Sequence, residues 1–319
     1  MKKKILSSSI FFFIVFFLLY SEGCSNIASE YFSTGVKQYN NGDYNLAEKS
    51  FTKSIKEDPA DALAYYQRGK DRIKLGKYSE GISDYSQAIV LKYGFINAYL
   101  NRANAEIIIN NYEDALRDLD TALNLKPNDL NLLFNRAYLK SLMNDYDGAI
   151  KDYNKILKID PTYTKAYVNR GNLKGSMGQH LNAITDFTIA IEIDSQNINA
   201  LVNRGTDKAI IGDYDGAIAD FTLALQINKN DKEIYFLRGD AFSMKKSFKN
   251  AVKDFSEIIE MDSLNGKAFY KRGINLFYLN KKRAACKDLK HSGELGYFPA
   301  YEVINKTCKK KRLRRKGRR

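Results

Sequence analysis

Small, aromatic and polar positions recur with a single period along most of this chain. From Ala28 to residue 299 they repeat every 34 residues without an insertion, so eight units follow one another. In each unit, positions 8 and 20 hold small residues, while positions 4 and 24 hold large apolar ones. Small residues that face large ones let two helices approach closely and interlock. The pattern therefore predicts a pair of helices in each unit.

The turn between the two helices is predicted at position 15 of each unit. The residues found there are Gly42, Gly76, Gly178, Gly212, Asn110, Asn144 and Asn280. Glycine and asparagine tolerate the left-handed backbone that follows many helix ends. Lys246 breaks this pattern, and the sequence offers no reason for it. Pro59, Pro127 and Pro161 at position 32 mark the end of the second helix.

These positions resemble the tetratricopeptide repeat family, in which small residues at 8 and 20, aromatics at 4, 17 and 24, and proline at 32 recur. The resemblance covers residues 28–299 and implies an all-α, right-handed superhelical solenoid of eight helical hairpins with a concave groove. Terminal repeats of such arrays need a polar cover. We expect a C-terminal capping helix, ending within residues 300–308, in which Ala300, Val303 and Ile304 cover the last hairpin.

The amino terminus has the composition of an export signal. Three lysines precede an apolar run from Ile10 to Tyr20, which is short for a membrane span of about 20 residues. Gly23 and Cys24 resemble a bacterial lipoprotein signal, in which residues 1–23 are removed, Cys24 is lipidated and residues 24–27 form a short linker. An ordinary cleaved signal and an uncleaved anchor remain alternatives. All three predict an exported protein on the periplasmic or surface side of the cell envelope.

Positive charge is concentrated at the carboxyl terminus. The net charge is +14, and residues 309–319 alone carry nine lysines and arginines and no acid. Such a tail cannot bury a core and is expected to be disordered. It would attract anionic lipid or polysaccharide in a salt-dependent way, while nucleic acid is an improbable partner for an exported protein. A purely solubilising role is the alternative.

Charged residues at two positions of the repeat predict structural ion pairs. Position 7 is arginine and position 23 is aspartate in repeats two to eight, whereas the first repeat has Thr34 and Ser50 there. Because the arginine and the aspartate occur together and are absent together, we predict that they pair within a repeat. The pair is expected to be partly buried between the two helices. If so, losing Asp186 alone should cost more than losing Asp186 together with Arg170, because the surviving charge is left uncompensated.

Catalytic chemistry has little support, and no enzyme activity, metal site or cofactor is predicted. His180 and His291 are the only histidines and lie in different repeats, outside any triad or metal-ligand spacing. His180 occupies position 17, where an aromatic is usual, so packing is its expected role. Cys286 is expected to be a small core residue, and a bridge to Cys308 is left open.

The groove implied by the family resemblance is the expected binding site. Its inner wall comes from the first helix of each hairpin. The amides and aromatics there are Asn101, Asn104, Asn135, Asn169, Asn172, Asn203, Phe134 and Tyr138. Amides offer a donor and an acceptor that match a peptide backbone. Their row resembles the asparagine ladder of O-linked N-acetylglucosamine transferases. Inheritance by repeat duplication explains the row equally well.

Two functions follow. The first is a scaffold anchored in the membrane through Cys24 that binds an extended peptide segment of a partner protein in the groove. The second is a charge-driven binder of anionic envelope lipid or polysaccharide through residues 309–319.

Overall fold

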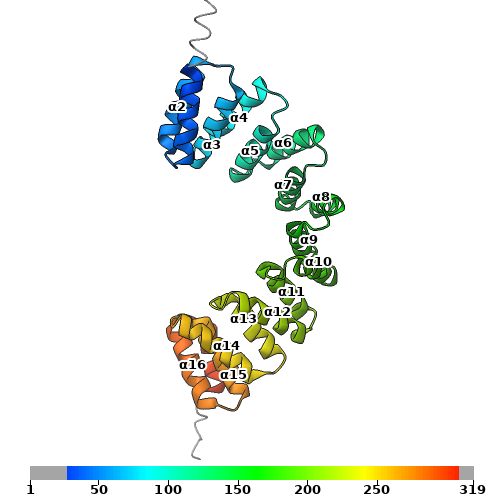
Figure 1. The fold of residues 1–319 in the computed structure, drawn as a ribbon. Helices are drawn as coiled ribbons and strands as arrows, with labels where there is room; N and C mark the ends of the chain where they lie inside the picture. Colours follow the sequence, from blue (N-terminus) through cyan, green and yellow to red (C-terminus); the bar gives the residue numbers. More distant parts are fainter. Residues whose placement is uncertain (1–26, 309–319) are drawn as a thin grey trace, which may run out of the picture. The chain divides into compact units, whose positions relative to one another are not determined.

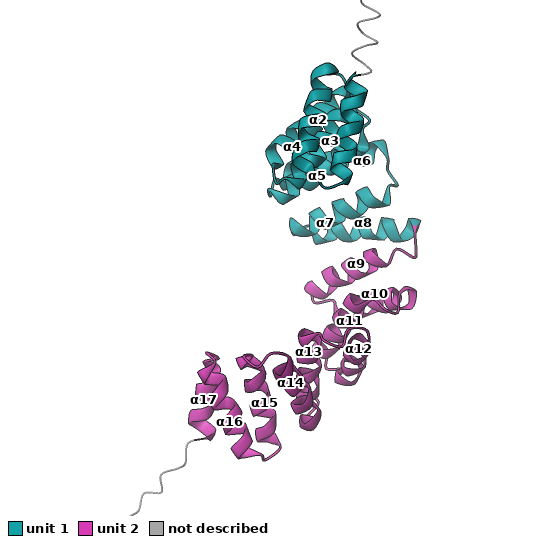
Figure 2. Ribbon diagram, turned by 60° about the vertical axis from the view of Figure 1, so that its left-hand side comes forward, with its two compact units in different colours: residues 1–159 teal, residues 160–319 magenta. Residues whose placement is uncertain are grey.

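The computed structural model describes residues 27–308, and within that range it consists of helices joined by short turns (Figure 1). The chain divides into two compact units, residues 1–159 and residues 160–319 (Figure 2). Each unit is a series of helical hairpins, in which helices pack mainly against their neighbours along the chain. The all-α repeat solenoid predicted from the sequence is therefore confirmed. The predicted signal, Cys24 and the basic tail lie outside the described residues.

The helices follow the 34-residue period. In the first unit, residues 27–40 are helical and are followed by α2 (Tyr44–Glu57), α3 (Ala62–Lys74), α4 (Tyr78–Leu91), α5 (Ile96–Ile108), α6 (Tyr112–Leu125), α7 (Leu130–Leu142) and α8 (Tyr146–Ile159). The second unit contains α9 (Thr164–Ser176), α10 (His180–Ile193), α11 (Ile198–Ile210), α12 (Tyr214–Ile227), α13 (Lys232–Met244), α14 (Phe248–Met261), α15 (Gly266–Tyr278), α16 (Lys282–Glu294) and α17 (Pro299–Thr307).

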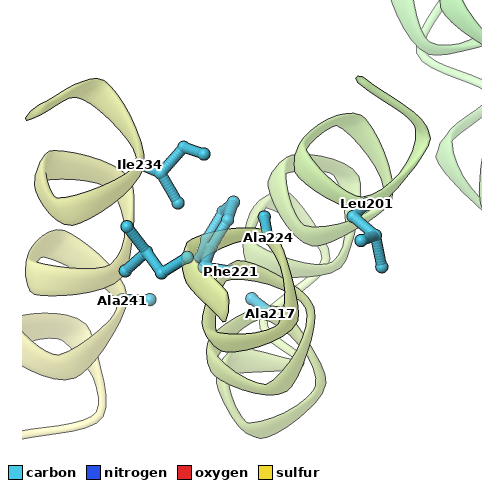
Figure 3. Packing of buried hydrophobic residues seen from close by; sticks show 7 residues of the cluster. Leu201, Ala217, Phe221, Ala224, Ile234 and Ala241 are labelled. Carbon is cyan, nitrogen blue, oxygen red and sulfur yellow. The ribbon is translucent and has the colours of Figure 1, made fainter. Parts of the chain in front are cut away.

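A large residue set against a small one holds each hairpin together. Phe221 of α12 is 1% exposed and packs in a cluster that includes Leu201 of α11 and Ile234 of α13 (Figure 3). A Cβ atom at Gly205 of α11 would lie 2.8 Å from the Phe221 ring, so any larger residue there would push the helices apart. Burying one such ring contributes roughly 1.5–3 kcal/mol. The small and large residues that alternate in the sequence are thus the residues that pack between the two helices.

The turns adopt the left-handed backbone that position 15 predicts. Gly42, Gly76, Gly178 and Gly212 have φ between 75° and 87°, and Asn110, Asn144 and Asn280 lie between 59° and 64°. Lys246 adopts the same conformation, with φ of 63°. The hairpin geometry therefore overrides the local preference of this lysine.

Replacing Lys246 with glycine is expected to stabilise the α13–α14 hairpin by roughly 1 kcal/mol, because glycine adopts a positive φ without a Cβ clash. Slower hydrogen exchange across α13 and α14 would report the gain. The matched control is Lys245→Gly, where φ is −69° and glycine should weaken the helix end instead. Faster exchange in the Lys246→Gly variant would contradict this account.

The last helix, α17, packs against α16. Ala300 is fully buried, and the Tyr301 ring lies against Gly293, where a Cβ atom would come within 2.8 Å of it. Cys286 of α16 and Cys308 at the end of α17 form a disulfide, with Cα atoms 5.7 Å apart. Cys286 is therefore a bridging residue rather than only a small core residue. Of the helices within residues 27–308, none is long and apolar enough to cross a membrane.

Candidate functional site

The seven arginine–aspartate pairs expected within the repeats are all present. In each, the arginine Nε and Nη2 groups donate to the two carboxylate oxygens at 2.6–3.1 Å. The pairs are Arg68–Asp84, Arg102–Asp118, Arg136–Asp152, Arg170–Asp186, Arg204–Asp220, Arg238–Asp254 and Arg272–Asp288. The aspartate side chains are at most 10% exposed. These groups are therefore committed to holding the two helices of each hairpin together.

The same arginines also join successive repeats, which the sequence analysis missed. The Nη1 group of Arg102 donates to Ser86 Oγ at 2.8 Å, and that of Arg238 donates to Thr222 Oγ1 at 3.1 Å. The equivalent acceptors elsewhere are Thr52, Asp120, Thr188 and Ser256. A signal existed, because position 25 holds a short polar residue in repeats one to seven and Lys290 in the eighth, which no further repeat follows.

The predicted asparagine row is not uniform in the first unit. The Asn101 amide donates to Tyr66 Oη at 2.9 Å, whereas the Asn135 amide donates back to the Asn131 carbonyl of its own helix at 2.7 Å. Asn104 is partly buried. Phe134 packs edge-on against Tyr153, with ring centroids 5.8 Å apart, and Tyr138 is 46% exposed. Of the two predicted aromatic anchors, Phe134 therefore serves packing and Tyr138 stays accessible.

In the second unit, two members of the row meet. Asn169 donates to the Lys165 carbonyl of its own helix at 2.8 Å. Asn203 instead donates from Nδ2 to Asn172 Oδ1 at 2.7 Å, which links α11 to α9. Both of these amides line a cavity.

That cavity, called the α9–α11 cavity below, has a volume of about 380 Å³. Its polar lining comprises Asn172, Ser176, His180, Asn203, Thr206 and Asp207. Phe187 and Ile210 supply apolar surface to it. The cavity lies on the first-helix face, since most of its lining belongs to α9 and α11.

A histidine–aspartate hydrogen bond missed from the sequence lies in the wall of this cavity. His180 Nδ1 lies 2.7 Å from Asp207 Oδ1, and the two side chains are 23% and 10% exposed. The expectation that His180 serves only packing is therefore incomplete. The signal was the coincidence of a histidine in a column of tyrosines with an aspartate at position 10 of the next repeat, where leucine or alanine is more common.

The other histidine, His291, forms no such contact with an acidic residue of another helix within residues 27–308. His291 contacts Phe269 edge-on, with centroids 4.6 Å apart, and lies 3.5 Å from Glu294 on its own helix. Within residues 27–308, no group of three histidine, cysteine or acidic side chains is arranged to hold a metal ion. The α9–α11 cavity is thus the best-defined candidate site of the second unit.

Comparison with known proteins identifies the repeats. Tetratricopeptide repeat family models match residues 96–129, 131–163 and 164–197. A search of curated proteins finds no significant match. The chain contains tetratricopeptide repeats, as the periodic positions predict, and such repeats generally serve as scaffolds for protein–protein interaction.

Solved structures share the fold at low sequence identity. A tetratricopeptide repeat protein from Cytophaga hutchinsonii is 17% identical, with a TM-score of 0.67 over 75% of this chain and 99% of that one. YrrB, described as a tetratricopeptide repeat protein with an unusual peptide-binding site, is 22% identical, with a TM-score of 0.53 over 59% of this chain and 97% of its own. A chain from the Cut9–Hcn1 complex is 14% identical, with a TM-score of 0.52 over 83% of this chain and 53% of that one.

Proposed function

We propose that this protein is a non-enzymatic scaffold of the cell envelope that binds an extended segment of a partner protein along the first helices of its second unit. The observation that carries the proposal is an exposed apolar row at position 13 of successive repeats. Ile210, Met244 and Tyr278 are 59%, 63% and 63% exposed on α11, α13 and α15. Apolar side chains aligned on one face, beside a polar cavity, are typical of interaction surfaces.

Polar groups on the same face supply hydrogen bonds. The linked amides of Asn172 and Asn203 lie in the cavity at the start of this row. Asp240 of α13 lies 2.8 Å from Lys271 of α15, which leaves both charges near the row. A main chain laid along the helices would pair with such groups while its side chains contact the apolar row.

Two features support a location outside the cytoplasm. The apolar run from Ile10 to Tyr20 followed by Cys24 resembles a lipoprotein signal. The Cys286–Cys308 disulfide suits an oxidising compartment, because cytosolic thiols are kept reduced. We therefore propose an envelope lipoprotein anchored through Cys24.

The second candidate function rests on charge. Residues 309–319 carry nine basic residues, and in this alternative they attach the protein to anionic lipid or polysaccharide. The two functions differ in their dependence on salt, since polyelectrolyte binding weakens steeply as ionic strength rises.

An affinity capture from solubilised envelopes separates these functions. Changing Ile210, Met244 and Tyr278 to serine is expected to reduce the capture of a discrete partner at least tenfold, because it removes the anchoring surface. The matched control changes Leu181, Leu223 and Met261 to serine, three exposed apolar residues of the second helices α10, α12 and α14. This control, and a variant that ends at Cys308, should capture as the wild type does.

Equal losses in the two serine variants would contradict binding on the first-helix face. Loss of all capture on deleting residues 309–319, together with release of the wild type by salt, would favour the charge-driven function instead.

A further inference from the structure

We propose that the α9–α11 cavity is a subsite for one basic side chain, arginine or lysine, of the bound segment. The inference rests on the proposed peptide-binding function and gives it a chemical preference. It follows from an inventory of the hydrogen-bonding groups that the cavity leaves unused.

The His180–Asp207 pair contributes an acceptor. A carboxylate cannot donate, so the hydrogen between His180 Nδ1 and Asp207 Oδ1 belongs to the ring, and Asp207 uses only Oδ1 for it. Among residues 27–308, Asp207 Oδ2 has no hydrogen-bond partner, and it is not one of the carboxylate oxygens sealed from solvent. It therefore opens onto the cavity.

Glycine keeps this carboxylate accessible. A Cβ atom at Gly175 would lie 3.2 Å from both Oδ1 and Oδ2 of Asp207. Six of the other seven repeats carry a larger residue than alanine at this position, such as Ile73 and Phe277. The absence of a side chain at Gly175 thus leaves space in front of the charge.

The remaining polar groups also favour a donor. Asn203 uses Nδ2 to bond Asn172, which leaves Asn203 Oδ1 as an acceptor and the Asn172 amide as a donor. The Thr206 hydroxyl donates to the Val202 carbonyl at 2.8 Å, so its oxygen can only accept from a ligand. Acceptors from Asn203, Thr206 and Asp207 thus line the cavity, beside the Asn172 amide as a donor and the Ser176 hydroxyl, which can donate or accept.

The negative charge of Asp207 is not neutralised by nearby lysines. Lys174 lies 2.8 Å from Asp186, and Lys208 lies 2.9 Å from Asp220, so each cation is paired elsewhere. Asp207 therefore has no lysine partner within residues 27–308, and its Oδ2 stays available to a cationic ligand in the cavity. A cation rich in N–H donors is the complementary ligand, and guanidinium offers five of them.

The size and apolar lining suit a side chain. A volume of about 380 Å³ accepts one long side chain, and Ile210 and Phe187 offer apolar surface to its methylene stem. Because Ile210 also begins the exposed row, a chain that inserts its basic side chain here continues directly along Met244 and Tyr278.

Small probes test the cavity directly. Ethylguanidinium is titrated into the isotope-labelled full chain, and its neutral isostere ethylurea serves as the matched probe. We expect saturable shifts of the Asn172 amide and the His180 ring, at least tenfold tighter for ethylguanidinium. Asp207→Asn should weaken this binding at least tenfold. Asp215→Asn, a 75% exposed acid of the second helix α12, should leave it unchanged.

If Asp207→Asn does not fold, His180→Phe replaces it, because Phe248 occupies the same position of the seventh repeat. That variant removes the hydrogen bond that His180 donates to Asp207 Oδ1 and should weaken ethylguanidinium binding several-fold. Equal binding of the two probes, absence of saturation, or wild-type binding by the variants would overturn the proposal.

Selection from a random peptide library distinguishes this inference from the proposed function. One outcome is that the selected peptides bind only when Ile210, Met244 and Tyr278 are present, yet show no enrichment of a basic residue at any position. That result would support the proposed function and refute the basic subsite. Tight ethylguanidinium binding without any such peptide would support the subsite and contradict peptide capture. Basic enrichment that disappears in Asp207→Asn would support both.

Discussion

Asp254→Ala is expected to destabilise the α13–α14 hairpin by about 3–5 kcal/mol, because it leaves the Arg238 guanidinium partly buried without its carboxylate. Asp254 is 2% exposed and accepts from Arg238 Nε and Nη2 at 2.9 and 2.8 Å. This pair gives a cleaner test than Asp186, since Lys174 also contacts Asp186 and would survive removal of Arg170. Position 11 of the seventh repeat is Phe242, so no second cation complicates it.

The double change Arg238→Ala with Asp254→Ala should be less damaging than Asp254→Ala by at least about 1 kcal/mol, because neither charge is left unpaired. Repeat arrays can unfold in parts, so hydrogen exchange of α13 and α14 is the appropriate measurement. The control is Asp114→Ala, which removes the exposed pair with Arg117 and should cost about 0.5 kcal/mol or less. Additive losses for Arg238 and Asp254 would refute an obligate pair.

Asp71→Leu is expected to stabilise the first unit by about 2–4 kcal/mol at pH 8, which few single substitutions achieve. Asp71 is fully buried, and neither of its carboxylate oxygens has a hydrogen-bond partner within residues 27–308. Burial, reinforced by the charge of Glu48, raises the pKa of Asp71 to about 7. Other repeats place Ala105, Leu139 or Leu173 at the same position, so leucine fits the architecture.

The gain should depend on pH in a defined direction. Because the folded pKa lies above the unfolded value of 3.8, the folded state holds this proton more tightly. The wild type therefore loses stability as pH rises from about 4 to about 7, and the advantage of Asp71→Leu should shrink by on the order of 2 kcal/mol between pH 8 and pH 5.

Urea unfolding at pH 5 and pH 8 measures this difference. Glu57→Gln, at the exposed end of α2, is the control and should show no such pH-dependent gain. An advantage of Asp71→Leu that is the same at both pH values would show that Asp71 does not titrate as described.

Residue size and period were enough to predict the hairpins. A glycine at 205 set sixteen residues before a phenylalanine at 221 requires two closely packed helices, and the same pairing recurs around Gly171 and Phe187. The arginine–aspartate pairs were predictable for a related reason, because their joint absence from the first repeat exposed their dependence on each other. Because the chain repeats, the residue type at each position can be compared across several repeats.

The candidate site departs from the period, so the repeat positions mark His180 and Asp207 as unusual but do not show that they meet. His180 and Asp207 lie 27 residues apart, and only the stacking of one hairpin on the next brings Nδ1 within 2.7 Å of Oδ1. Asn172 and Asn203 likewise meet across two helices, whereas Asn135 and Asn169 bond their own backbones. Local composition determines which helices form. Whether a side chain turns toward its own helix, a neighbouring helix or a cavity depends on packing between repeats, and the residue type at a single repeat position does not show that packing.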